Sequence, residues 1–386
     1  MHFFTSTLLA LAASVPHLVS AAPAIASPAV RKRAESDILV FKFADVLEQL
    51  ESAFYEQAIA KFQEADFIAA GFPSASIPVE QFLNIQKDEA THSVVLQAAL
   101  RSFGEEPITN CRFNFDAALT DVATMAATAR VVENVGVSAY LGGATLLTDP
   151  VLLTAAGSIL TVEARHQTVL NILSGTGTSV PNPFDFALTP SEILALAGPF
   201  FDGPCDLGIP ANPALSVTNT GAIGPGTRLT FESPAITRGE DQQNLFCQML
   251  VGGKGTAIPF PIDDCVVPDD INGPVAIFVT SDGQPLVNNV RDRATTQLVA
   301  GPALAFIDIA PQTIGAIARG GNGQVVSTAT TTVSPAEATA IILSASGTVP
   351  APQPTGTAAV TISESANLET GPSADGAITV NGWELL

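Results

Sequence analysis

The chain has 386 residues, of which 47% are hydrophobic and 14% are charged, and its formal net charge is −21. This length is typical of two domains. The strong excess of acidic residues argues against nucleic acids and anionic membrane surfaces as partners. Beyond the N-terminal leader, no apolar stretch is long enough to cross a bilayer, so we expect no membrane span.

The first 33 residues are typical of a processed leader. Residues 3–15 are mostly apolar and too few to span a bilayer, and Val19-Ser20-Ala21 offers the small side chains of a cleavage site. The sequence therefore predicts a signal peptide at 1–21. The basic cluster Arg31-Lys32-Arg33 predicts the end of a propeptide at 22–33, and its removal takes the formal charge from −21 to −24. We expect a secreted or extracellular protein, with the cell wall as one destination.

Four cysteines lie outside the leader, at Cys111, Cys205, Cys247 and Cys265. An even count in a secreted chain predicts two disulfides, for which three pairings exist. No Cys-x-x-Cys motif is present, so a zinc or redox motif is not indicated. We favour the pairs Cys111–Cys205 and Cys247–Cys265, because each then stays within one expected domain.

The first part of the chain, 34–207, has the apolar spacing of α-helices. Asp149-Pro150 is a start signal, and Gly104 and Gly175 are stop signals. Thr189-Pro190-Ser191-Glu192 predicts a short fifth helix. The four long helices are expected at 37–65, 78–103, 115–147 and from 150 to just before Gly175, with a crossover loop at 104–114. Together they predict a four-helix bundle.

The pattern changes after about residue 212, where short β-prone runs alternate with Gly, Pro and Asp turns. We expect an all-β, sandwich-like domain at 212–344, which makes the chain a multidomain α+β protein. The tail at 345–386 is rich in Thr, Ser, Pro and Gly and predicts a flexible or O-glycosylated segment. The expected strands are 228–231, 246–251, 275–280, 296–299, 304–309 and 338–343, with a last strand at 377–380.

Every histidine and tyrosine outside the leader belongs to one repeated pattern, in which Glu-x6-Tyr and Glu-x-x-His alternate twice. In chain order the pattern consists of Glu48 and Tyr55, Glu89 and His92, Glu133 and Tyr140, and Glu163 and His166. Each pair falls on a different long helix. Residues three apart share one helix face, so each Glu-x-x-His pair can bind one metal ion. Four carboxylates and two imidazoles on four helices are the ligand set of a di-iron or di-manganese bundle.

The chemistry of such a centre assigns a role to each ligand. Two dications about 4 Å apart repel each other and require bridging carboxylates, which we assign to Glu89 and Glu163. Glu48 and Glu133 are then the terminal carboxylates, and the two histidines supply nitrogen. Carboxylate oxygens combined with imidazole nitrogens suit iron or manganese, so we expect two such ions per chain.

The tyrosines are the candidate catalytic residues. Residues seven apart share a helix face, so Tyr55 is expected above Glu48, and Tyr140 above the corresponding glutamate of its own helix. Each phenol is expected to hydrogen-bond a ligand carboxylate or to lie near a redox path. The first helix also carries Glu51 and Glu56. Glu51 remains an alternative to Glu48 as ligand, and Glu56 is expected to be solvated.

A single Glu-x-x-His pair is typical of a solvated helix surface. Here two copies combine with two Glu-x6-Tyr pairs on helices whose flanking residues are apolar. Charged groups on apolar helices need partners, which favours a metal site. The alternative is a vestigial site, in which the glutamates and histidines pair with one another.

Three segments carry a family resemblance: LEQLESAFY at 47–55, GVSAYLGGA at 136–144 and SILTVEARH at 158–166. They resemble the ferritin-like domain of desiccation-related proteins and of fungal stress-response and sexual-development proteins. The Glu-x6-Tyr element also resembles rubrerythrins. The resemblance covers about 37–173. It implies a ferritin-like four-helix bundle, secretion and a link to stress or sexual development, but no substrate.

Three functions compete at this point. The first is an oxidoreductase in which the metal centre acts on peroxide, dioxygen or ferrous iron. The second is a non-enzymatic secreted or cell-wall-associated protein, whose bundle is a scaffold and whose β domain binds a protein or a polysaccharide. The third is cage-type iron storage, which is less favoured because the β domain would have to fit around a shell.

Overall fold

The computed structural model describes residues 35–175, 177–236, 244–320, 371–372 and 379–380. The expected leader, the expected strand at 338–343 and most of the tail lie outside these residues. The chain divides into two compact units, 1–347 and 348–386. In the second unit, β7 (Gly371–Pro372) and β8 (Thr379–Val380) form an antiparallel pair. Within the described ranges, no helix has the length and apolar character needed to cross a membrane.

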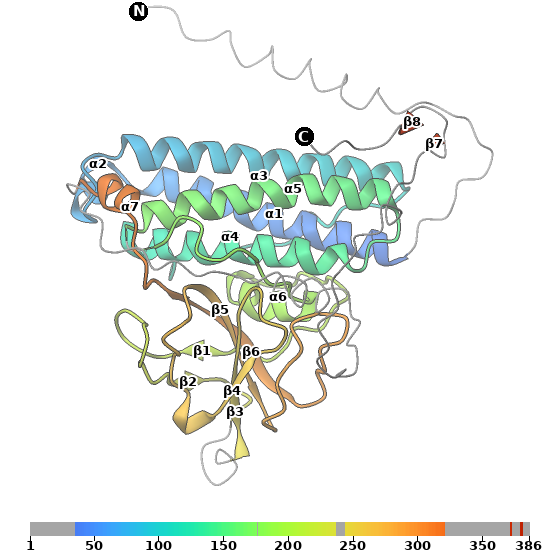
Figure 1. The fold of residues 1–386 in the computed structure, drawn as a ribbon. Helices are drawn as coiled ribbons and strands as arrows, with labels where there is room; N and C mark the ends of the chain where they lie inside the picture. The colour runs from blue at the N-terminus through green and yellow to red at the C-terminus, as the bar shows by residue number, and fades with distance from the viewer. Residues whose placement is uncertain (1–34, 176, 237–243, 321–370, 373–378, 381–386) are drawn as a thin grey trace, which may run out of the picture. The chain divides into compact units, whose positions relative to one another are not determined.

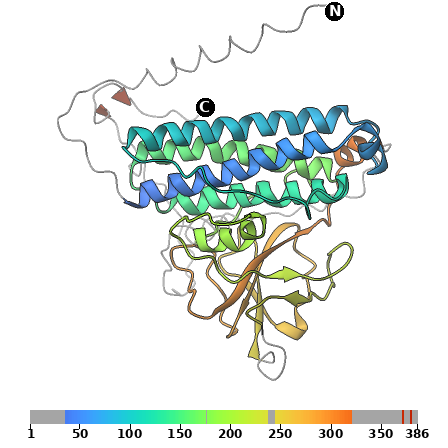
Figure 2. The same cartoon turned by 180° about the vertical axis from the view of Figure 1, so that it is seen from behind.

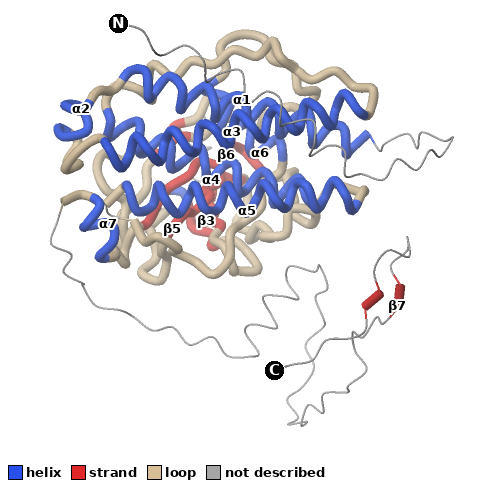
Figure 3. The backbone as a smooth tube through the Cα atoms, turned by 90° about the horizontal axis from the view of Figure 1, so that it is seen from above, coloured by secondary structure: helices blue, strands red, loops and turns tan. Residues whose placement is uncertain are grey.

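Four long helices form a bundle, seen from the side in Figure 1 and from above in Figure 3. α1 packs against α3, and α4 packs against α5. Their apolar faces bury large side chains such as Phe54, Phe82, Met125 and Leu170, so helical periodicity in the sequence produces the core. The helices are α1 (Glu35–Lys61), α3 (Ser76–Ser102), α4 (Val122–Ala144) and α5 (Pro150–Leu173).

Two expected helix boundaries were wrong, and local capping explains both. α1 ends at Lys61 and a separate short helix, α2 (Glu64–Ala69), follows, because the Gln63 backbone N–H donates to Asp66 in a new capping box. α4 begins at Val122 and not at residue 115. The Asp121 carboxylate accepts a 2.7 Å hydrogen bond from the Thr124 backbone N–H and starts the helix there.

The segment between α3 and α4 runs along the bundle from one end to the other (Figure 2). Near the start of α1, Glu105 pairs with Lys42 at 2.7 Å. Further along the chain, the Phe115 ring lies 5.4 Å from that of Phe54, near the other end of α1. The expected crossover is therefore present, over the longer stretch 103–121, and it makes α4 antiparallel to α1.

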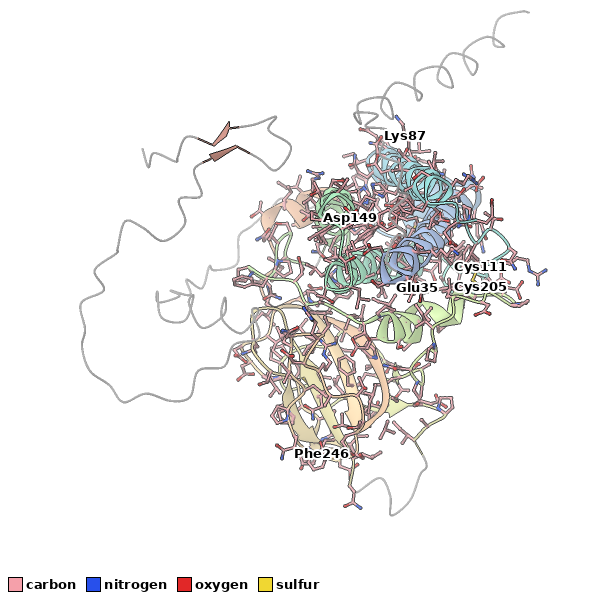
Figure 4. The ribbon with its side chains drawn as sticks, turned by 90° about the vertical axis from the view of Figure 1, so that its right-hand side faces the viewer. Glu35, Lys87, Cys111, Asp149, Cys205 and Phe246 are labelled. Carbon is pink, nitrogen blue, oxygen red and sulfur yellow. A yellow bond between two sulfur atoms is a disulfide. The ribbon has the colours of Figure 1, made fainter. Side chains whose placement is uncertain are left out.

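Both favoured disulfides are present. Cys111–Cys205 ties the crossover segment to the chain that follows the bundle (Figure 4), and Cys247–Cys265 lies in the β-rich part. Cys247 and Cys265 are fully buried. Within the described residues no cysteine is free.

The β-rich part is built on a four-stranded antiparallel sheet of order β4-β3-β5-β6. Central strand β5 is buried along its whole length. Two short strands, β1 (Ser216–Val217) and β2 (Phe231–Glu232), form a second sheet, and Val217 and Phe231 pack on the first sheet in a sandwich-like arrangement. The strands of the larger sheet are β3 (Phe246–Leu250), β4 (Ile258–Pro261), β5 (Gly273–Thr280) and β6 (Leu298–Ile307).

The strand predictions differ from the structure at several places. The short strand β1 was not expected, and β2 overlaps the expected run 228–231 only at Phe231. The runs 296–299 and 304–309 were expected as two strands, but they belong to the single strand β6. Gly301, with φ of +111°, absorbs an irregularity in the pairing with β5, so the strand continues through Gly-Pro. Sequence reasoning also missed β4, which contains Pro259 and Pro261. It is an edge strand, where proline is tolerated.

α6 (Pro190–Ala197) lies between the bundle and the sheet and contacts both α4 and β6 (Figure 1). The expected start at Thr189 is present, with Glu192 closing a capping box. Glu192 also binds buried Arg293 at 2.5 Å. One hydrophobic core runs from the bundle through α6 to β5, and α7 (Thr313–Ala318) then returns the chain to α5.

Replacing Cys111 and Cys205 together by Ser is expected to lower the free energy of unfolding by about 2–4 kcal/mol, because the unfolded crossover segment gains freedom. Helical content in the absence of denaturant should be unchanged, since the four helices are held by their buried core. Urea unfolding followed by far-UV circular dichroism measures both quantities. An unchanged unfolding midpoint would contradict a stabilising role for this bond.

Candidate metal centre

The six residues predicted as ligands converge at the centre of the bundle. All four glutamates are fully buried, and the two histidine rings lie 6.5 Å apart between centroids. They form two overlapping groups, in each of which the ligand atoms lie within 4.8 Å of one another. Glu89 and Glu163 belong to both groups, as bridging ligands would. The groups are Glu48, Glu89, His92 and Glu163, and Glu89, Glu133, Glu163 and His166.

The centre has approximate two-fold symmetry because the sequence pattern repeats. His92 Nδ1 lies 3.0 Å from Glu89 Oε2 and 3.2 Å from Glu48 Oε2. His166 Nδ1 lies 2.7 Å from Glu89 Oε1 and 3.2 Å from Glu133 Oε2. Each imidazole thus faces one shared carboxylate and the glutamate of one Glu-x6-Tyr helix.

The tyrosines bind glutamates of the opposite helix, and not those of their own helix. Tyr55 Oη donates a 2.6 Å hydrogen bond to Glu133 Oε1, and Tyr140 Oη donates to Glu48 Oε1. The expected hydrogen bond from each phenol to a predicted ligand carboxylate is present, but its acceptor is the glutamate of the other helix and not the one on the phenol's own helix. α1 and α4 run antiparallel, so a residue two turns along one helix lies level with the glutamate of the other. Each phenol fixes one carboxylate oxygen and leaves the other to face the histidine.

Burial makes these carboxylates hard to ionise. Burial raises the pKa of Glu48 to about 8, although contact with His92 offsets part of the rise. Burial also raises the pKa of Glu51 and of Glu163 well above 4.5, and repulsion from neighbouring carboxylates adds to it. The centre therefore retains protons unless positive charge replaces them.

The imidazoles supply positive charge beside the carboxylates. Burial alone lowers the pKa of His92, but contacts led by that with Glu163 outweigh it and raise the pKa to about 12. The pKa of His166 is raised to about 11 in the same way, chiefly by Glu133. Burial would raise the pKa of Glu89, yet the two histidines lower it to about 2. Protonated histidines thus stand where cations are needed.

Ligand atoms that lack a well-formed hydrogen bond test whether the residues fit metal ions. Several buried ligand atoms lack a hydrogen bond of acceptable geometry: Glu89 Oε1, Glu133 Oε2, both carboxylate oxygens of Glu163, and His166 Nδ1. Glu89 Oε1 and Glu133 Oε2 pair with His166 Nδ1 by charge, at 2.7 and 3.2 Å, but without hydrogen-bond geometry. These residues belong to the two groups whose ligand atoms, supplied by several helices, lie within 4.8 Å of one another. The donor set of buried carboxylates and imidazoles could therefore hold metal ions.

A fifth carboxylate breaks the symmetry of the centre. Glu51, three residues after Glu48, is buried like it, with 3% of its surface exposed. At the equivalent position, three residues after Glu133, stands Gly136. A β-carbon on Gly136 would overlap Glu163 Oε2 and lie 3.1 Å from Glu51 Oε1. The absence of a side chain at Gly136 thus makes room for two carboxylates.

Sequence reasoning missed two carboxylates that support the ligands. Asp88 Oδ2 lies 3.2 Å from His166 Nε2, on the side away from the centre. Val162, an apolar residue, occupies the equivalent position in the second half. Asp45 accepts a 2.7 Å hydrogen bond from Ser93, the neighbour of His92 in sequence. The position of Asp88 directly before a ligand glutamate was the available signal. Glu56, as expected, is exposed.

Residues 36–176 match the family model of the ferritin-like domain. This part of the chain is a ferritin-like domain. The match covers α1 to α5 and all six predicted ligands, and it leaves the β-rich part outside. A comparison with curated proteins finds no match.

The raised pKa values predict how the stability of the metal-free protein depends on pH. Carboxyls such as Glu48 hold protons to higher pH when folded than when unfolded. Their stabilising contribution is fully present below about 4.5 and is lost as pH rises through the folded value, about 8 for Glu48. The histidines stabilise the folded protein fully below about pH 6.5. This contribution is lost as the pH rises towards their folded pKa values, about 12 for His92 and about 11 for His166. The lowered pKa of Glu89 has the opposite effect: its contribution to stability is present above pH 4.5 and is lost as the pH falls towards about 2.

Thermal unfolding in a chelator should therefore show a midpoint that falls from about pH 5 to about pH 8. Adding Mn²⁺ at the higher pH should restore stability, because bound cations replace the lost protons. A metal-free protein more stable at about pH 8 than at about pH 5 would contradict these pKa directions.

Gly136→Ala should displace the Glu163 carboxylate and weaken metal binding by about tenfold or more, a loss typical of disturbed ligand support. Gly157→Ala on α5 is the matched control, because a β-carbon added at Gly157 has no neighbouring side chain or segment within 4 Å. The control should bind metal normally and gain up to about 1 kcal/mol from better helix propensity. Titration with Mn²⁺ measures both affinities, and equal binding by the two variants would contradict the steric role of Gly136.

Proposed function

We propose that the bundle binds two iron or manganese ions and is an oxidoreductase that acts on peroxide, dioxygen or ferrous iron. The observation that carries the proposal is the pair of overlapping buried groups that share Glu89 and Glu163. Five buried glutamates in one bundle are unfavourable unless cations accompany them. A scaffold has no need of such an arrangement, because apolar residues would fill the same space at lower cost.

The contacts support the proposed ligand roles. Glu89 and Glu163, which belong to both groups, would hold both ions, Glu48 and Glu133 would each complete one group, and each histidine would supply one nitrogen. When bound, the ions supply one-electron chemistry towards oxygen species. The protein holds the ligands in place and keeps the centre buried.

Tyr55 and Tyr140 are the proposed catalytic residues. Burial, with the neighbouring carboxylates, raises the pKa of both phenols well above 10. Each Oη therefore keeps its proton and donates it in a hydrogen bond to a terminal glutamate. These protons lie beside the proposed ligands, where they set carboxylate orientation and are available to a reacting oxygen species.

We also propose that the protein is secreted and stress-associated. Two disulfides support an oxidising compartment. The signal peptide at 1–21, the propeptide at 22–33 and the finer resemblance to desiccation-related and fungal proteins rest on the sequence. The β-rich part is the proposed contact for a cell-wall polysaccharide or a protein partner.

Metal analysis of the purified protein, followed by assays with peroxide, dioxygen and ferrous iron, tests this function. We expect about two ions per chain and turnover in at least one assay. Glu163→Ala should lose a bridge, and metal content and turnover should fall together while helicity stays. Glu56→Ala, an exposed position on α1, is the matched control and should behave as wild type.

Wild-type protein loaded with either metal but inactive in all three assays would contradict the enzymatic function. The same result together with unchanged metal content in Glu163→Ala would contradict the metal centre as well.

A further inference from the structure

A hollow of about 280 Å³ lies where the bundle meets the β-rich part. Leu141 and Thr145, at the C-terminal end of α4, line it on the bundle side. On the β side it is lined by Gly253 and Lys254, which follow β3. None of the proposed metal ligands lines this hollow. Ligand sites lie preferentially at such junctions, and the volume is near the lower end of their usual range of about 300–1,000 Å³, so it suits a small ligand.

An aromatic ring in this hollow is left uncovered by the protein core. Phe184 lines the hollow and is 42% exposed. Every other phenylalanine that the structure describes is buried or half-buried, so the exposure of Phe184 is unusual in this chain. An exposed ring in a hollow offers a flat apolar face that a ligand can cover.

Close backbone packing positions Phe184 and its neighbour Asp185. A β-carbon on Gly252 would overlap the Phe184 carbonyl oxygen, and one on Gly253 would lie 3.0 Å from Phe184 Cδ2. Gly253 also has a φ of +80°, which favours glycine. The turn after β3 therefore lies directly against the segment that carries both side chains.

The hollow offers hydrogen-bond acceptors. Asp185 makes no hydrogen bond or ion pair with any residue that the structure describes, and its carboxylate lines the hollow. It keeps access to solvent, yet burial by the surrounding protein raises its pKa. The Asn288 side-chain amide donates to the carbonyls of Val251 and Lys254, at 2.9 and 2.7 Å, which leaves its own oxygen to accept.

The side-chain donors of the lining, in contrast, are already engaged. Thr145 donates to the Gly142 carbonyl, and the Asn289 amide donates to Asp292. The Lys254 ammonium is held by Asp270 at 3.0 Å. A ligand must therefore bring its own donors, together with an apolar face for the ring of Phe184.

The charges of the hollow favour a neutral ligand. An anion would be repelled by Asp185 and by a chain of formal charge −21. A cation would be drawn to Asp185 but repelled by the ammonium of Lys254 in the same lining. A sugar ring is neutral, carries hydroxyl donors at its edge and presents C–H groups on its face.

We propose that this hollow binds one unit of a neutral polysaccharide, with the sugar ring stacked on Phe184 and its hydroxyl groups donating to Asp185 and Asn288. The inference rests on the proposed contact of the β-rich part with the cell wall. It narrows that contact, because it selects a polysaccharide over a protein partner and gives the residues that bind it.

Titration calorimetry of the full chain with soluble hexasaccharides of β-1,3-glucan, cellulose and chitin tests the site. The wild-type protein should bind at least one of them. Phe184→Ala should weaken that binding about tenfold, which equals about 1.4 kcal/mol, because the stacking face is lost. Ile309→Ala is the matched control, since Ile309 is also 42% exposed and does not line the hollow. It should bind as wild type.

Asp185→Asn tests the acceptor independently of the ring. It should weaken binding about fivefold, because hydrogen bonds to an ionised acceptor are stronger than those to a neutral one. Asp269→Asn removes the same charge from an exposed position outside the hollow and should have no effect. Thermal unfolding of each variant should match wild type, because both side chains are exposed.

Wild-type protein that binds none of the three hexasaccharides would overturn the proposal. So would binding that Phe184→Ala and Asp185→Asn leave at the level of their controls. Binding of oligolysine in place of the sugars would also overturn it and would favour a cationic partner.

Retention on insoluble β-glucan and chitin separates this inference from the proposed wall contact. If wild type and both variants are retained equally, the wall contact stands and the site in the hollow is wrong. If wild type is not retained, the wall contact itself is contradicted. Neither measurement needs metal or turnover, so both are independent of the proposed oxidoreductase.

Discussion

The burial of negative charge at the centre of the bundle is the constraint on which the rest of the structure depends. Glu48, Glu89, Glu133 and Glu163 are fully buried, and Glu51 is nearly so. Ionised carboxylates in such a place require positive charge and fixed hydrogen-bond donors. The two histidines provide part of the positive charge, and the two tyrosines provide hydrogen-bond donors. The antiparallel arrangement of α1 and α4, set by the long crossover, is what brings each tyrosine to the glutamate of the other helix.

Much of the bundle and of its centre could be predicted, because local chemistry determined it. The repeated spacings placed each ligand on a known helix face. The apolar residues on those faces pack in the interior of the bundle, and they bring the carboxylates there with them. Helix starts with strong caps, such as Asp149-Pro150 and Thr189, were also readable. The pairing Cys111–Cys205 followed from assigning both cysteines to one domain.

What could not be predicted depends on neighbours distant in sequence. The partner of Tyr55 is decided by which helix lies beside α1, and no local spacing contains that information. The burial of Glu51 depends on a missing side chain at Gly136, a residue 85 positions away. β6 passes through Gly301-Pro302, a pair that reads as a turn, because pairing with β5 outweighs the local preference. Tertiary contacts override local signals at each of these places.

The most direct test of the central claim is anomalous X-ray scattering from crystals loaded with iron or manganese. Two peaks per chain are expected, about 4 Å apart, with both ions in contact with Glu89 and Glu163 and each with one histidine. A centre without anomalous peaks, in which the glutamates and histidines pair with one another, would contradict it.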